Sequence, residues 1–145
     1  MKKYTAVLCL LILLLSACHK NQHKVTINDI SYYVDLADDD NERAMGLMYR
    51  KEMANDEGML FIFPDTEYRA FWMKNTLIPL DILYFDQNRK LINVIENTPP
   101  CKNTTTRCPN YPSNRPAKYV LEINAGLSQK HGFKAGDEMV IQLKK

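Results

Sequence analysis

The sequence predicts a small, mainly β (α+β) domain, with strands curled into a barrel or sandwich and one or two short helices packed against them. Three observations support this class. About seven short stretches have the length and pattern of strands, turn residues separate them, and only two segments show helical spacing. Two helices are too few for a doubly wound sheet. With 145 residues and no internal repeat, one compact domain is expected.

The expected strands alternate apolar and polar residues or form short apolar runs. They cover residues 25–27, 33–36, 59–63, 68–73, 82–85, 91–95, 119–123 and 138–143. The first two ranges are two short strands or one broken strand. Pro64 is expected to stop the third. The polar turn 86–89 joins two of the strands and predicts a hairpin.

The first helix is expected to begin at the aspartate run 38–40, because acidic side chains stabilise the unpaired N–H groups of a helix N-terminus. Apolar residues at helical spacing extend it to Tyr49. Gly46 lowers its stability by ~1 kcal/mol relative to alanine and indicates that another segment packs close to the backbone. The second helix, 125–131, is expected to end at Gly132.

The N-terminus predicts export. Two lysines precede an apolar run over residues 7–15, which is shorter than the ~20 residues that span a bilayer. Residues 15–18, Leu-Ser-Ala-Cys, resemble the lipobox of bacterial lipoproteins, which implies cleavage before Cys18 and a lipid on its thiol. The expected layout is a signal peptide over 1–17, a lipidated tether over 18–24 and a single domain over 25–145.

The same resemblance implies an address in the cell envelope, facing the periplasm. His19 stands where an aspartate would favour the inner membrane, so the outer membrane is expected over the inner. The signal peptide carries two lysines and no acidic residue, so the remaining chain holds 17 basic and 17 acidic residues. No basic cluster is left after cleavage. Nucleic acid is therefore excluded as a partner. The expected partner is a membrane, which the domain would reach through the lipid on Cys18.

Cys101 and Cys108 remain after the signal and the lipidated cysteine are set aside. An even pair in an oxidising compartment predicts a disulfide. The spacing is too wide for a thioredoxin-like C-x-x-C motif, and no histidine lies nearby to complete a zinc site. Prolines on both sides predict a stiff, constrained loop over 97–117 rather than a central strand.

Five motifs occur in a recognisable order. They are RAMGLMYR at 43–50, GMLFIF at 58–63, FWMKNT at 71–76 followed by PLD at 79–81, Pro100-Cys101 with Cys108-Pro109 and Tyr111, and AKYVLE at 117–122 followed by 125–126 and 136–137. Together they resemble DUF192, a prokaryotic domain of unknown function, over about residues 33–143. The resemblance implies a mostly β fold and frequent export, and it implies no reaction or cofactor.

Polar residues interrupt the most apolar segment, AFWMKNTLIPLDILYFD at 70–86. Lys74, Asn75 and Thr76 fit a tight turn, since asparagine tolerates positive φ. They also fit the mouth of a pocket that binds a carboxylate or a sugar, with Trp72 as a stacking surface. Asp81 is expected at or near the core, where a carboxylate needs a partner. Candidate partners are Lys74, Arg43 and Arg50.

Three functions remain open from the sequence. The first is a small-ligand or envelope-component binding domain, with a site built from Arg43, Trp72, Lys74, Asn75 and Asp81. The second is a hydrolase of an envelope polymer that uses Asp81 and Glu122 as its two carboxylates. The third is a structural or interaction protein without a small-molecule site. No metal or cofactor is expected.

Met45 and Met48 share a face of the predicted helix, and their thioether sulfurs are soft enough to bind Cu(I). At this spacing methionine more often fills a core. Whether the chain catalyses any reaction stays open at this point.

Overall fold

The computed structural model describes residues 22–101 and 107–144. The predicted signal peptide and the predicted lipidation site Cys18 lie outside the described residues. The first strand begins at His23, two residues inside the segment expected to be a tether. Across the described ranges, no helix has the length and apolar character needed to cross a membrane.

Seven of the nine strands in the described residues form one curled sheet, which confirms the mainly β class. The elements are β1 (His23–Ile27), β2 (Ile30–Ala37), α2 (Asp40–Met45), β3 (Glu57–Glu67), β4 (Ala70–Trp72), β5 (Leu80–Phe85), β6 (Leu91–Thr98), β7 (Asn110–Pro112), β8 (Ala117–Asn124), α3 (Leu127–His131) and β9 (Met139–Gln142). The sheet order is β6-β5-β8-β3-β2-β1-β9, and β4 pairs with β7 in a separate two-stranded ribbon. Only β2 and β3, among the described strands, pair in parallel.

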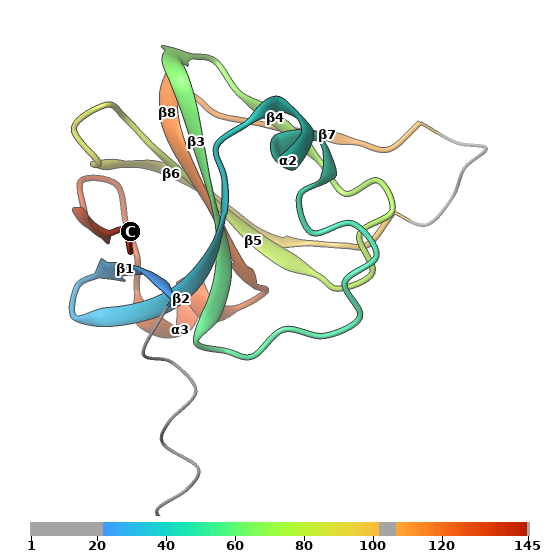
Figure 1. Ribbon diagram of the computed structural model, residues 1–145, viewed down its shortest axis with the longest axis horizontal. Helices are drawn as coiled ribbons and strands as arrows, with labels where there is room; N and C mark the ends of the chain where they lie inside the picture. The colour runs from blue at the N-terminus through green and yellow to red at the C-terminus, as the bar shows by residue number, and fades with distance from the viewer. Residues whose placement is uncertain (1–21, 102–106, 145) are drawn as a thin grey trace, which may run out of the picture.

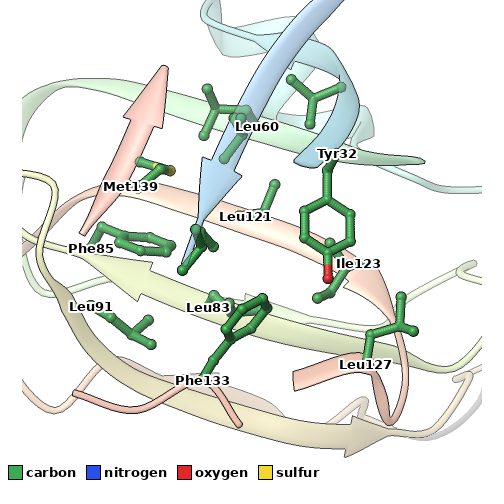
Figure 2. Packing of buried hydrophobic residues seen from close by; sticks show 13 residues of the cluster. Tyr32, Leu60, Leu83, Phe85, Leu91, Leu121, Ile123, Leu127, Phe133 and Met139 are labelled. Carbon is green, nitrogen blue, oxygen red and sulfur yellow. The ribbon is translucent and has the colours of Figure 1, made fainter. Parts of the chain in front are cut away.

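The central strands are buried on both faces. On β5, Leu83 and Phe85 face the larger apolar cluster, while Ile82 and Tyr84 face a second cluster on the other side of the sheet. This follows from the alternation of side chains along a strand. Figure 2 shows the larger cluster filling the space that the curled sheet encloses. In Figure 1, α2, β4 and β7 lie together on one side of the sheet, away from β1 and α3.

Helix α2 is shorter than predicted. Asp39 is its N-cap, and the side chains of Asp39 and Glu42 form a capping box. The helix ends at Gly46, whose φ of 48° favours glycine and breaks the helical repeat before Tyr49. A Cβ atom on Gly46 would lie 3.3 Å from the Phe61 ring. The predicted close packing at this glycine is confirmed.

Two predicted boundaries, the end of the strand at Pro64 and the loop over 97–117, were wrong. In both places proline is tolerated because the strand is irregular or lies at an edge. Strand β3 continues through Pro64 to Glu67, and its register against β8 shifts between Ile62 and Glu67. The loop predicted over 97–117 contains β7, which pairs only with β4 and so does not need a full set of ladder donors. The predicted disulfide between Cys101 and Cys108 is confirmed.

Candidate functional site

A cavity of about 250 Å³ lies on the outer face of the sheet, between α2, β3, β4 and the turn that follows β4. Nine of its thirteen lining residues are apolar or aromatic, two are basic and one is acidic. The lining residues are Arg43, Ala44, Met45, Leu47, Met48, Phe61, Phe63, Ala70, Phe71, Trp72, Lys74, Thr76 and Glu122. An apolar concavity with a few polar groups is the usual form of a small-molecule site.

Glu122 is the acidic residue of this cavity. It lies in the middle of β8, paired with Met59 of β3 and Ile82 of β5, and its side chain is only 4 % exposed. No ion pair of the described residues includes it. Burial raises the pKa of Glu122 to about 8. At pH 7 the carboxyl group is therefore mostly protonated and uncharged.

Aromatic rings form one wall of the cavity. Phe61 and Phe63 alternate along β3 and reach the same face of the sheet, where Phe71 of β4 meets both edge-on at centroid distances of 4.8 Å and 6.4 Å. Phe71 also meets Tyr84 of β5 at 5.9 Å. The Tyr84 hydroxyl donates a hydrogen bond to the backbone oxygen of Tyr111 at 2.5 Å. This packing ties the β4–β7 ribbon to the sheet.

The rim of the cavity is the turn predicted at Lys74-Asn75-Thr76. The Thr76 N–H donates to the Met73 carbonyl at 3.1 Å, and Asn75 has a φ of 55°. Cys101 holds this turn from outside: its N–H donates to the Met73 carbonyl at 3.1 Å, and its own carbonyl accepts from the Asn75 N–H at 3.0 Å. The prediction of a turn is confirmed, and two of its residues, Lys74 and Thr76, line the cavity.

Lys74 and Trp72 lie next to each other on this rim. The Lys74 Nζ atom is 5.2 Å from the centroid of the Trp72 ring, and Trp72 is 49 % exposed. None of the ion pairs in the described part of the chain includes Lys74. Its ammonium group is therefore available to an anion at the mouth of the cavity.

Asn75 was predicted as a binding residue, and it does not line the cavity. Its side-chain amide donates to the Tyr49 Oη atom at 2.9 Å and contacts the Met48 sulfur at 3.8 Å. Its carbonyl accepts from the Tyr49 N–H at 2.9 Å. Asn75 thus joins the segment after α2 to the rim turn and supports the rim from behind.

Arg43, predicted as a binding residue, lines the cavity, but its guanidinium group is already engaged. It donates to the backbone oxygens of Asp38 at 2.5 Å and Ile62 at 2.7 Å, and to the Asp40 carboxylate at 2.6 Å. The group also lies 5.4 Å from the Phe63 ring centroid. These contacts fix α2 against β3, so the principal role of Arg43 is to shape the cavity.

Asp81 lies away from the cavity, and its predicted ion pair with a basic side chain was wrong. It is fully buried, and its carboxylate accepts three backbone N–H groups, from Asn97 at 2.8 Å, Gly126 at 3.1 Å and Ser128 at 2.9 Å. Backbone amides satisfy a buried carboxylate without burying a second charge. Together with burial, Asp81 also raises the pKa of Tyr32.

Asp81 and Glu122 do not share a site. In the pairing of β5 with β8, Ile82 is opposite Glu122 and Asp81 is opposite Ile123. Neighbouring residues of a strand point to opposite faces, so the two carboxyl groups lie on opposite sides of the sheet. The two-carboxylate site predicted for a hydrolase, with Asp81 and Glu122 together, is therefore wrong.

The sequence missed the aromatic wall of the cavity and considered Glu122 only as a partner of Asp81. The spacing of Phe61 and Phe63 already indicated that they share a face. It gave no sign that Glu122, sixty residues later in the chain, shares that face too, because this depends on the pairing of β3 with β8. Met45 and Met48, weighed as metal ligands, also line the cavity.

Comparisons with known proteins place this geometry in a family context. The family model DUF192, described as "Uncharacterized ACR", matches residues 23–141. A protein of unknown function from Novosphingobium aromaticivorans DSM 12444 has a similar structure, with a TM-score of 0.72 and 36% identity over 82% of this chain and 83% of that one. A protein from Sinorhizobium meliloti 1021 described as a "putative transcription regulator" matches with a TM-score of 0.74 and 35% identity over 83% and 92%. No curated protein matches the chain.

Proposed function

The chain belongs to the uncharacterised DUF192 family, and on this premise we propose that it is a cell-envelope binding domain for a small amphipathic carboxylate. One observation carries the proposal: the cavity beside α2 combines aromatic walls, the buried and mostly uncharged Glu122 carboxyl, and the exposed cation of Lys74 at its rim. An apolar body in the cavity and an anionic head group at the rim would satisfy each of these features.

The charges around the cavity favour an anionic over a cationic head group. The Phe63 ring already contacts the guanidinium groups of Arg43 at 5.4 Å and Arg69 at 3.9 Å, and the Trp72 ring contacts the Lys74 ammonium group. These rings are therefore occupied by the chain's own cations and would not attract another. A carboxylate at the rim would gain the attraction of Lys74 while staying in water.

The size of the cavity limits the ligand. A closed apolar cavity of about 150 Å³ holds one benzene molecule. The present cavity, of about 250 Å³ and open at its rim, therefore suits a substituted aromatic ring or a short branched chain. Phe71 and Trp72 on β4 offer aromatic surface to such a ring.

The envelope address in this proposal is supported by the sequence. Residues 15–18 resemble a lipobox, and a lipid on Cys18 would attach the domain to a membrane, with the outer membrane favoured over the inner. The test is the mass of the mature chain purified from membranes. A Cys18→Ser chain is expected to lose the acyl mass and leave the membrane fraction, and an unchanged mass would reject the anchor.

Trp72 is the only tryptophan of the chain, so its fluorescence reports on the cavity directly. We expect phenylacetate to change the fluorescence of the full chain saturably. Lys74→Met is expected to weaken binding by about fivefold, which corresponds to ~1 kcal/mol for an exposed ion pair. Lys130→Met removes an exposed lysine from α3, which lies away from the cavity, and should leave binding unchanged.

A flat titration with phenylacetate, and no shift of the unfolding midpoint at the highest concentration, would reject the small-ligand proposal. Equal weakening by Lys74→Met and Lys130→Met would reject the rim as the position of the head group. The function as a structural or interaction protein would then be favoured, with the exposed Trp72 and Tyr68 as its first candidate contacts.

A further inference from the structure

Glu122 is a polar group that the domain leaves without a partner at the inner end of the cavity. Its two neighbours across the strands, Met59 and Ile82, have apolar side chains. The hydroxyl of nearby Tyr84 donates to the backbone oxygen of Tyr111. Among the described residues, no hydrogen bond or ion pair involves the Glu122 carboxyl group, and burial alone accounts for the shift of its pKa. Its carboxyl group lines the cavity, so water or a ligand in the cavity is left to hydrogen-bond with it.

We infer, building on the function proposed above, that Glu122 selects ligands by the chemical group at their inner end, the end that lies beside this residue. The cavity takes an amphipathic carboxylate whose inner end is an uncharged hydrogen-bond acceptor, such as a ketone or amide carbonyl. Glu122 donates its O–H to that acceptor, while Lys74 receives the carboxylate at the rim. Glu122 is thus a specificity-determining residue.

The chemistry of a neutral carboxyl group disfavours a hydrocarbon and an ionised carboxylate at the inner end. A hydrocarbon would displace water from the Glu122 O–H and give it nothing to bond with, which leaves a buried donor unpaired. An ionised carboxylate would be removed from water beside an acid that lacks a paired cation. A carbonyl oxygen is an uncharged acceptor, so it can take the hydrogen bond that the single O–H donor of Glu122 offers.

The charged and titratable groups around Glu122 come from three elements. Arg43 of α2 is held by its own acceptors, Lys74 after β4 lies over the Trp72 ring, and Tyr84 of β5 keeps its proton because burial raises its pKa. Glu122 itself loses its proton around pH 8. Once ionised, it has no O–H to donate and repels a carbonyl oxygen.

Two ligands of nearly equal size and shape test whether the chemistry of the inner end determines the affinity. In 4-acetylphenylacetate and 4-isopropylphenylacetate, a carbonyl oxygen replaces a methyl group. We expect the full chain to bind the acetyl ligand about tenfold more tightly at pH 6.5, by Trp72 fluorescence and by calorimetry. Glu122→Gln, which keeps a donor, should retain most of this preference, and Glu122→Leu should lose it.

The pH profile gives a second test that does not depend on Glu122→Leu folding. Between pH 6 and pH 9, binding of 4-acetylphenylacetate to the unmodified chain should weaken by about tenfold, since one pH unit above the pKa leaves one tenth of the carboxyl protonated. In Glu122→Gln the affinity should stay constant over this range. The same profile in both chains would overturn the inference.

The outcomes distinguish the inference from the proposed function. If both ligands bind equally well, the small-ligand function stands and the role of Glu122 is rejected. If 4-(aminomethyl)phenylacetate binds more tightly than the acetyl ligand, Glu122 acts as an ionised partner of a cation and the inference is overturned. If neither phenylacetate nor its derivatives bind, the proposed function and the inference fail together.

Discussion

Replacing Asp81 by asparagine tests whether the buried carboxylate holds three separate segments together. One of its oxygens accepts the N–H groups of Asn97, at the end of β6, and Gly126, before α3, and the other accepts the N–H of Ser128 in α3. An asparagine side chain has one accepting oxygen. If that oxygen keeps the bonds from Asn97 and Gly126, the NH₂ group of the asparagine faces the Ser128 N–H. Two hydrogen-bond donors then meet without an acceptor between them.

The expected loss of stability follows from these contacts. A hydrogen bond to a charged group contributes ~1.5–3 kcal/mol, and a buried donor left unpaired costs ~1–3 kcal/mol. We therefore expect Asp81→Asn to lower the free energy of unfolding by about 3 kcal/mol. Asp81→Ala would leave all three N–H groups without this acceptor, the Ser128 N–H in a buried position, and a loss of about 5 kcal/mol or more would approach the whole stability of a small domain.

The assay is urea unfolding at pH 7, followed by far-ultraviolet circular dichroism. The matched control is Asp86→Asn, because Asp86 also accepts two backbone N–H groups, from Asn88 at 2.8 Å and Lys90 at 2.9 Å, but in an exposed turn where water replaces lost bonds. Asp86→Asn is expected to lower the free energy of unfolding by less than ~1 kcal/mol. Equal losses for the two variants, or less than ~0.5 kcal/mol for Asp81→Asn, would refute this account of the buried carboxylate.

Three further changes test other parts of the structure. Burial raises the pKa of Glu122 from 4.5 to about 8, so the folded state keeps a proton that the unfolded state releases in this range. The free energy of unfolding should therefore fall with rising pH between these values, by up to ~1.4 kcal/mol per pH unit. Glu122→Gln should remove this part of the slope in urea unfolding at pH 5 and pH 8, and identical slopes would contradict the assignment. Gly58→Ala places a Cβ atom 2.6 Å from the backbone oxygen of Glu122, so it should destabilise by ~2 kcal/mol or more. At Gly132 a Cβ atom meets nothing within 4 Å, but φ is 68°, so Gly132→Ala should cost only the ~1 kcal/mol of a left-handed backbone. If Gly58→Ala destabilises no more than Gly132→Ala, the clash is not the cause. Replacing Cys101 and Cys108 by serine should lower the free energy of unfolding by ~2.5 kcal/mol, as the chain-entropy model gives for so short a loop. The same replacement should also weaken phenylacetate binding, because Cys101 holds the rim turn. An unchanged affinity would show that the turn keeps its shape without the disulfide.

The sequence by itself determined the class of the fold and several local structures, because these depend on contacts between residues near each other in the chain. Alternating and apolar runs predicted the strands, and the aspartates before α2 predicted its capped start. Asn75 predicted a turn, since asparagine tolerates positive φ. Gly46 predicted a close approach, which Phe61 makes. The DUF192 motifs predicted the family that the comparison shows.

Only the tertiary structure decided which polar residues meet. Asp81 and Glu122 looked alike in the sequence, as single acids within apolar strands. The pairing of β5 with β8 sends them to opposite faces, one to three backbone amides and the other to a cavity. Register and pairing between distant strands are properties of the whole sheet, because a shift by one residue exchanges its two faces. For the same reason, the aromatic wall and the uncharged acid of the candidate site became visible only once β3, β4 and β8 were brought together.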